Sequence, residues 1–231
     1  MHIHLPKPLH GWREFAGEVG IIVIGILIAL AGEQVVESLH WRSETREFRQ
    51  AVDHELAIDL GTFQFNQLQQ RCTRSRLGEL QTMLDRARNG RPVHLSGSIS
   101  GPLQISQYTS VWDNKDAQVV AHLPPSVRLK YAELYDEFRA TADVKAAQTE
   151  AWANLEPFDE PGPLDLADRR NLHALITRAG SLASAMDSNW PVALRDAAAL
   201  GIEPHFEPEA AVAVRSVDKF PICRPILGDA Q

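Results

Sequence analysis

An uncharged run near the start of the chain constrains the fold more than any other feature. It reads VGIIVIGILIALAG from Val19 to Gly32 and contains no hydrogen-bonding side chain. Glu18 precedes the run and Glu33 follows it, so the sequence becomes polar at once on both sides. As an α-helix the run would cover roughly 21 Å, which is less than the hydrocarbon core of a bilayer, about 30 Å.

The flanks extend this run to the length of a membrane-crossing helix. The segment from Phe15 to Val36 is mostly apolar and would span roughly 33 Å if Glu18 and Glu33 lie at headgroup level. Trp12 and Trp41 would then lie roughly 43 Å apart, which matches a whole bilayer, and Trp favours both membrane interfaces. We therefore predict a transmembrane helix with the lipid bilayer as its partner and with these two tryptophans at the interfaces.

Two other interpretations of the run stay open. Ala29-Leu30-Ala31 is a small-x-small site, so a signal peptidase could cleave before Gly32. Against cleavage, Glu14 and Glu18 stand where a signal peptide carries cationic residues. An apolar run of this length can also be a buried helix of a soluble domain.

Small residues follow one face of the predicted membrane helix. Gly25, Ala29 and Gly32 recur at i, i+4 and i+7, and Glu18 lies one heptad before Gly25. Small residues at this spacing let helix backbones approach closely in lipid. The face predicts a homo-oligomer or a membrane-protein partner, although Gly and Ala are also common in membrane helices without any such role.

The opening of the chain resembles a known group of proteins. The residues that carry the resemblance are Trp12-Arg13-Glu14-Phe15, then Glu18-Val19, then the core from Ile21 to Leu30. They resemble the start of uncharacterised bacterial single-pass inner-membrane proteins, in which W-x-x-F is followed by a Glu and by an I-G-I-L-I-A-L segment. The resemblance implies a bacterial inner-membrane location and implies no activity.

The charges beside the membrane helix favour one orientation weakly. Lys and Arg nearly balance on its two sides, but Arg13 lies closest to the apolar core. This favours a cytoplasmic N-terminus and a periplasmic C-terminal domain. In that compartment Cys72 and Cys223 can form a disulfide, and the alternative is two separate thiols.

The remaining sequence predicts a mainly α-helical bundle domain. Of the 231 residues, 44% are hydrophobic, which excludes a disordered chain. The net charge of −7 argues against a nucleic-acid partner, because such proteins present a basic surface. The predicted divisions are a flexible tail (1–11), the transmembrane helix (12–38), a long stalk helix or helices (39–90), a helical domain (91–203) and an irregular C-terminal segment (204–231).

Apolar stripes at helical spacing predict the helices of this domain. One stripe comprises Phe48, Val52, Leu56, Leu60 and Phe63, and another comprises Val127, Tyr131, Leu134, Tyr135 and Phe138. Gly61 and Gly78 are candidate bends in the stalk. Helices are predicted over residues 105–123, 126–155, 165–189 and 191–201, and residues 210–217 fit either a helix or a strand.

No catalytic, metal or cofactor residue is predicted. The sequence contains no H-E-x-x-H, no G-x-S-x-G and no phosphate-binding P-loop. Glu55 and Asp59 share a helix face, but the preceding His54 lies on another face, so we expect a solvated face rather than a metal site. Glu133 and Glu137 are a similar pair on an acidic helix.

Two classes of function fit this sequence. The first is a membrane-anchored helical interaction or scaffold module that self-associates. The second is a tethered helical domain that binds or converts a small ligand in a pocket lined by Trp112, Tyr131 and Tyr135. Those three aromatic side chains could equally fill the core, and a deep pocket with converging histidines or carboxylates would favour the second class.

Overall fold

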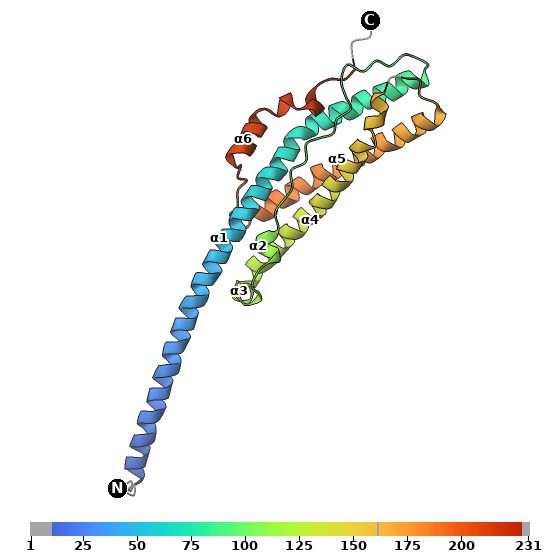
Figure 1. Cartoon of the computed structure of the whole chain (residues 1–231). Coiled ribbons are helices and arrows are strands. Elements are labelled where there is room, and N and C mark those ends of the chain that lie inside the picture. Colours follow the sequence, from blue (N-terminus) through green and yellow to red (C-terminus); the bar gives the residue numbers. More distant parts are fainter. Residues whose placement is uncertain (1–10, 161, 228–231) are drawn as a thin grey trace, which may run out of the picture.

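One helix organises the whole molecule. The computed structural model describes residues 11–160 and 162–227, so residues 1–10 of the tail predicted over residues 1–11 lie outside them. Helix α1 (Trp12–Arg88) has 77 residues without interruption. Its N-terminal part projects alone as a rod, and its C-terminal part lies among the other elements (Figure 1). The predicted mainly α fold, with an apolar N-terminal helix that continues into a bundle, is confirmed.

Three long helices form the bundle. Helix α5 (Leu166–Ala198) packs against both the C-terminal part of α1 and α4 (Pro125–Ala153). The second half of α1, predicted as a long stalk helix over residues 39–90, is therefore one wall of the bundle. Shorter elements complete the chain: α2 (Ser110–Asp113), α3 (Ala117–Ala121), η1 (Glu156–Asp159), α6 (Pro208–Arg215), η2 (Val217–Lys219) and η3 (Pro221–Cys223).

The core has two apolar clusters with buried polar side chains between them. The cluster nearer the rod contains the predicted stripes of α1 and α4, and Val52, Leu56, Tyr131 and Phe138 are fully buried there. The second cluster lies at the far end of the bundle and includes Leu80, Leu84, Trp152, Leu172 and Ile176. Between them α1 buries Asn66, Gln69, Gln70 and Thr73, and α4 buries Thr141, Lys145 and Gln148.

The predicted helix over residues 105–123 is wrong before Ser110, and the rest of it is two short helices, α2 and α3, rather than one. Residues 99–109 are not helical, and they form an extended strap that runs along α1 and α4 (Figure 1). Buried polar side chains hold the strap backbone. Gln69 donates from Nε2 to the Leu103 carbonyl at 2.9 Å and accepts from the Leu103 amide at 2.8 Å. These long-range bonds replace the local bonds of a helix, so periodicity alone could not predict the strap.

Gly61, a candidate bend, does not interrupt α1, which continues through it as a helix. Glycine is required at this position because the chain beyond α5 approaches α1 closely here. A Cβ atom built on Gly61 would lie 2.0 Å from the carbonyl oxygen of His205. The His205 amide donates to the Ala57 carbonyl at 2.8 Å, which ties this segment to α1. The other candidate bend, Gly78, also lies within the unbroken helix.

Helix α5 continues through Pro191, whereas the sequence predicted two separate helices with a break before this proline. Tertiary packing on both sides offsets the backbone hydrogen bond that proline removes. Trp190 packs edge to face on Phe63 with ring centroids 5.2 Å apart, and Ala193 is fully buried beyond the proline. Near the C-terminus, α6 shows that residues 208–215 are helical.

A disulfide and a buried arginine fasten the C-terminal segment to α1. Cys72 and Cys223 are bonded across a sequence separation of 151 residues. One turn further along α1, the fully buried Arg76 donates to the carbonyls of Ser98 at 3.0 Å and Pro221 at 3.1 Å, and also to that of Arg224. Its Nε atom donates to Glu79 at 3.0 Å, and Glu79 in turn accepts from the amide of Ile226 at 3.0 Å.

Candidate functional site

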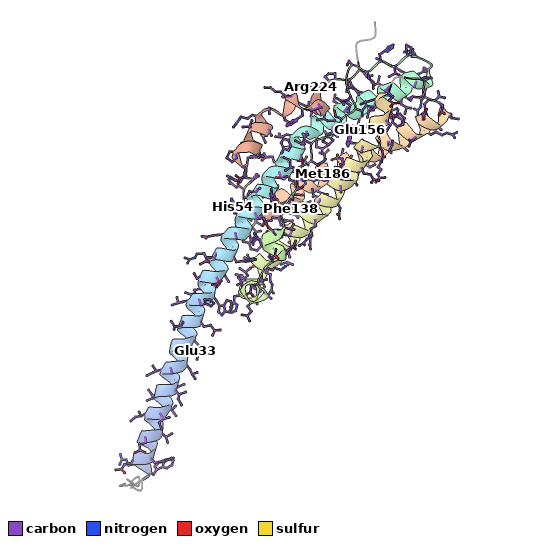
Figure 2. All side chains as sticks on the ribbon, viewed as in Figure 1. Glu33, His54, Phe138, Glu156, Met186 and Arg224 are labelled. Atoms are coloured by element: carbon purple, nitrogen blue, oxygen red, sulfur yellow. A yellow bond between two sulfur atoms is a disulfide. The ribbon has the colours of Figure 1, made fainter. Side chains whose placement is uncertain are left out.

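The rod of α1 exposes a continuous apolar surface. Its most apolar 18-residue window has a mean hydropathy of 2.3, and none of that window is buried. Figure 2 shows Glu33 on the free rod, while His54 and Phe138 lie where the bundle begins. The helix is long and apolar enough to cross a membrane. A buried core helix is excluded for the described chain, because no other described segment covers these residues.

The small-residue face is likewise uncovered in the single chain. Gly25, Ala29 and Gly32 are exposed, and a Cβ atom added at Gly25 or Gly32 would meet nothing within 4 Å. Glu18 is exposed on the same rod. The face is therefore free to meet a second helix.

The two interface tryptophans have different surroundings. Trp12 is 79% exposed at the start of α1. Trp41 is half-buried and stacks on the ring of His122, with centroids 4.1 Å apart and planes within 11°. This stack is where the loop after α3 reaches the rod. The sequence offered no signal for the pairing, since the two residues are 81 positions apart and His122 stands alone in its segment.

The three aromatic residues proposed as a ligand pocket instead fill the core. Trp112 is 5% exposed, while Tyr131 and Tyr135 are fully buried. The rings of Trp112 and Tyr135 stack with centroids 5.2 Å apart. Each tyrosine donates its hydroxyl to a carboxylate of α1: Tyr131 to Asp53 at 2.6 Å and Tyr135 to Glu55 at 2.7 Å. Their mutual packing supports the core interpretation over a ligand pocket.

The expected solvated face around residues 53–59 is wrong for Glu55 and Asp59, which are both buried. Glu55 accepts from the hydroxyls of Ser110 at 2.8 Å and Tyr135 at 2.7 Å, and from the Val111 amide at 3.0 Å. Asp59 accepts from the Tyr108 amide at 2.8 Å. The two carboxylates accept hydrogen bonds from the end of the strap, and buried polar groups need such partners.

A buried acid and a buried amine lie on the two sides of the strap. Burial raises the pKa of Asp59 to about 7, and the bond from the Tyr108 amide opposes this shift only in part. Burial lowers the pKa of Lys145 to about 8, although the charge of Asp59 opposes that shift. Lys145 donates to the Ile105 carbonyl at 3.0 Å and to Gln107 at 3.3 Å. Both groups therefore titrate near neutral pH while they hold the strap.

The free energy of unfolding of the bundle should fall as pH rises from about 4 to 7, because the buried Asp59 carboxyl loses its proton. The folded state binds the Asp59 proton more tightly than the unfolded chain, whose aspartate pKa is about 3.9, so this contribution is lost as pH rises through the folded pKa. Asp59→Asn should remove this fall and raise the free energy of unfolding at pH 7.5 by up to about 4 kcal/mol. Urea unfolding at pH 5 and pH 7.5 measures the difference.

The matched control for this prediction is Asp85→Asn, because the Asp85 side chain is 53% exposed. It should leave the pH dependence of unfolding unchanged. Parallel pH profiles for the wild type and Asp59→Asn would contradict the assignment.

The other predicted carboxylate pair, Glu133 and Glu137, lies on α4. Glu133 pairs with Lys130 at 2.8 Å. In the described residues, one close group of three potential metal ligands comprises Cys72, Asp218 and Cys223, and the disulfide occupies both sulfur atoms.

Comparisons of the chain with protein-family models, with curated proteins and with solved structures find no match. The function has to be inferred from the residues of this chain and from their arrangement.

Proposed function

We propose that the chain is a single-pass membrane protein whose helical bundle serves as an interaction or scaffold module. One observation carries this proposal: the fully exposed apolar rod and a wall of the bundle core belong to one unbroken helix, α1. A lipid environment would cover the rod from about Phe15 to Val36, and the polar residues from Glu37 onward would emerge with the bundle. Because no hinge separates the two parts, the membrane segment would set the orientation of the whole bundle.

A bacterial inner membrane with the bundle in the periplasm is the location we propose. The disulfide between Cys72 and Cys223 supports the periplasm, because disulfides persist in oxidising compartments and are rare in the cytosol. Arg13, next to the apolar core on the other side, supports a cytoplasmic N-terminus. The resemblance of residues 12–30 to bacterial single-pass proteins supports the inner membrane.

Self-association through the small-residue face is the interaction we propose. The double variant Gly25→Leu with Ala29→Leu should convert the oligomer to a monomer, because two leucines would keep the helix backbones apart. The mass of the intact assembly in mild detergent, measured by native mass spectrometry, tests this expectation. Gly20→Leu is the matched control, since it makes the same change on another face of the rod, about 140° from Gly25.

Two results of this experiment would count against the proposal. A monomeric mass for the wild type would remove self-association, and an oligomer that survives the double variant would place the interface elsewhere. A second protein that co-purifies with the wild type and is lost from the double variant would support a membrane-protein partner at the same face.

A further inference from the structure

Two histidine rings from distant parts of the chain lie beside each other on the surface of the bundle. His54 belongs to α1, and His205 belongs to the segment between α5 and α6. Their ring centroids are 6.3 Å apart, and the ring planes are inclined by 45°. Both residues are exposed. Figure 2 labels His54 where α1 meets the chain that leads to α6.

The backbone of His205 is fixed on the face of α1 that carries His54. The His205 amide donates to the Ala57 carbonyl at 2.8 Å, about one turn after His54. Gly61 leaves room for the His205 carbonyl oxygen, which would lie 2.0 Å from a Cβ atom at that position. His54, Ala57 and Gly61 lie within about 60° of one another around the helix axis. The fold itself therefore brings the two rings together.

Glu207 adds a carboxylate to this pair of rings. It stands two residues after His205, just before α6 begins at Pro208, and its Oε1 atom lies 4.0 Å from His205 Nε2. The His205 side chain is 56% exposed and the Glu207 side chain is 53% exposed, so both have room to turn toward a common point. Imidazole nitrogens and carboxylate oxygens are ligands that Zn²⁺ takes in proteins, often with water in an open position.

The spacing of the two rings fits one shared ion. A histidine nitrogen binds Zn²⁺ at about 2.0–2.1 Å, which puts each ring centroid roughly 3.2 Å from the ion. Two rings on one ion therefore lie at most roughly 6.5 Å apart, and roughly 5.2 Å apart at the tetrahedral angle. The separation of 6.3 Å is within this limit, and side-chain rotations that bring the rings about 1 Å closer give the tetrahedral arrangement.

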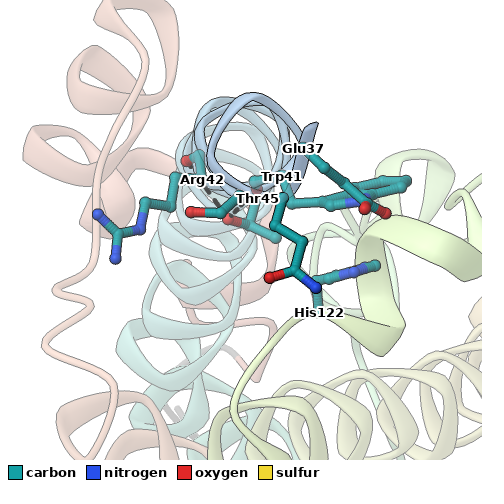
Figure 3. A pocket seen from close by; sticks show the side chains of 7 residues that line it. Glu37, Trp41, Arg42, Thr45 and His122 are labelled. Atoms are coloured by element: carbon teal, nitrogen blue, oxygen red, sulfur yellow. Dashed lines mark hydrogen bonds between the residues drawn. The ribbon is translucent and has the colours of Figure 1, made fainter. Parts of the chain in front are cut away.

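Two other exposed histidines have different neighbours. His122 stacks on Trp41, and its Nδ1 atom is hydrogen-bonded to a backbone carbonyl of α3 (Figure 3). His40 lies 4.0 Å from Glu44, but the ring beside it is again Trp41. An indole ring does not supply a metal ligand, so neither position repeats the arrangement at His54.

We propose that His54, His205 and Glu207 form a binding site for a divalent transition-metal ion of the zinc type, with water as the remaining ligand. The ion joins α1 to the segment before α6, and so it fastens this edge of the bundle. The site lies in the bundle alone, so it does not depend on the membrane location or on the self-association proposed above.

Isothermal titration of the full-length chain with Zn²⁺ tests the site. The chain is held in phosphatidylcholine nanodiscs without reductant, so that Cys72 and Cys223 stay bonded and supply no thiolate. We expect the wild type to bind one Zn²⁺ at the site with a Kd of about 1–10 µM at pH 7.5. His54→Ala and His205→Ala should each weaken this binding at least about tenfold, and Glu207→Gln at least about threefold. Mg²⁺ should not bind there, because it prefers oxygen ligands.

His40→Ala is the matched control. It removes an exposed histidine of α1 that also lies 4.0 Å from a glutamate, and it should leave the Zn²⁺ affinity unchanged. His2, His4 and His10 are present in every variant, so any binding by them is common to all titrations. Unfolding curves recorded without Zn²⁺ should coincide for the wild type and the variants, which separates loss of binding from loss of the fold.

A second measurement reports whether the ion joins the two segments. Zn²⁺ at about ten times its Kd should raise the denaturation midpoint of the wild type and of His40→Ala, and should leave that of His54→Ala unchanged. A wild type that binds no Zn²⁺, or an affinity that survives the double variant His54→Ala with His205→Ala, would overturn the site.

Discussion

Arg76→Met is expected to lower the free energy of unfolding of the bundle by about 3–5 kcal/mol. The Arg76 side chain is fully buried, and its guanidinium group makes four hydrogen bonds to Glu79 and to the carbonyls of Ser98, Pro221 and Arg224. Methionine fills a similar length but donates no hydrogen bond. The substitution would remove the arginine donor from the three carbonyls and the ion-pair partner from the half-buried Glu79 carboxylate, and the segment after α6 would detach first.

Arg71→Met is the matched control for this variant. Arg71 lies on the same helix and pairs with Asp218 of the same C-terminal segment, but both side chains are largely exposed. An exposed pair of this kind contributes at most about 1 kcal/mol. Denaturant unfolding of the two variants in one detergent makes the comparison, and equal losses for Arg71→Met and Arg76→Met would contradict the role assigned to burial.

Removal of the disulfide is expected to have the second large effect. Cys72→Ser should lower the free energy of unfolding by about 2–5 kcal/mol, because the bond closes a very long loop and restricts the unfolded chain. Reductant added to the wild type should produce the same loss and should leave Cys72→Ser unchanged. Unfolding curves with and without reductant measure both effects.

The opposite pattern would identify two free thiols. A wild type that is insensitive to reductant and as stable as Cys72→Ser would show that the two cysteines are not bonded in solution. Arg76 and the disulfide hold the same segment. The double variant Arg76→Met with Cys72→Ser should therefore lose less free energy of unfolding than the two single losses added together.

Apolar periodicity predicted the long helices, because the residues that each helix buries recur at helical spacing on one face. Val52, Leu56 and Leu60 on α1 and Tyr131, Leu134 and Tyr135 on α4 all lie fully buried, as their spacing predicts. Helix ends were less predictable. Pro191 looked like a start signal, yet packing of Trp190 and Ala193 carries α5 through it.

The strap and its buried polar partners could not be predicted, because their interactions connect distant residues. Asp59 and Lys145 are charged residues of a type that usually lies on a solvated helix face. They are buried because both bind the backbone of the strap between α1 and α4. Gly61 was predicted only as a candidate bend, because the close approach of the His205 carbonyl has no local signature in the sequence. Arg76 offered one usable signal: it lies four residues from both Cys72 and Leu80, so it occupies the buried stripe of α1.

The apolar segment at the start of α1 was the most predictable feature, because its signal is the composition of a continuous run. The run predicted an apolar helix, and the structure adds that no residue of its most apolar window is buried and that the helix continues into the bundle. His122 was missed as the partner of Trp41, since a lone histidine in a polar segment indicates no contact.

Extraction of membranes with alkaline carbonate tests most directly whether lipid surrounds the rod of α1. Carbonate releases peripheral and soluble proteins and leaves proteins that span the bilayer in the pellet. The account predicts that the full-length chain, with residues 1–31 still present by intact mass, remains in the pellet and is released by detergent. Full-length chain in the carbonate supernatant, or a mature chain that begins at Gly32, would contradict it.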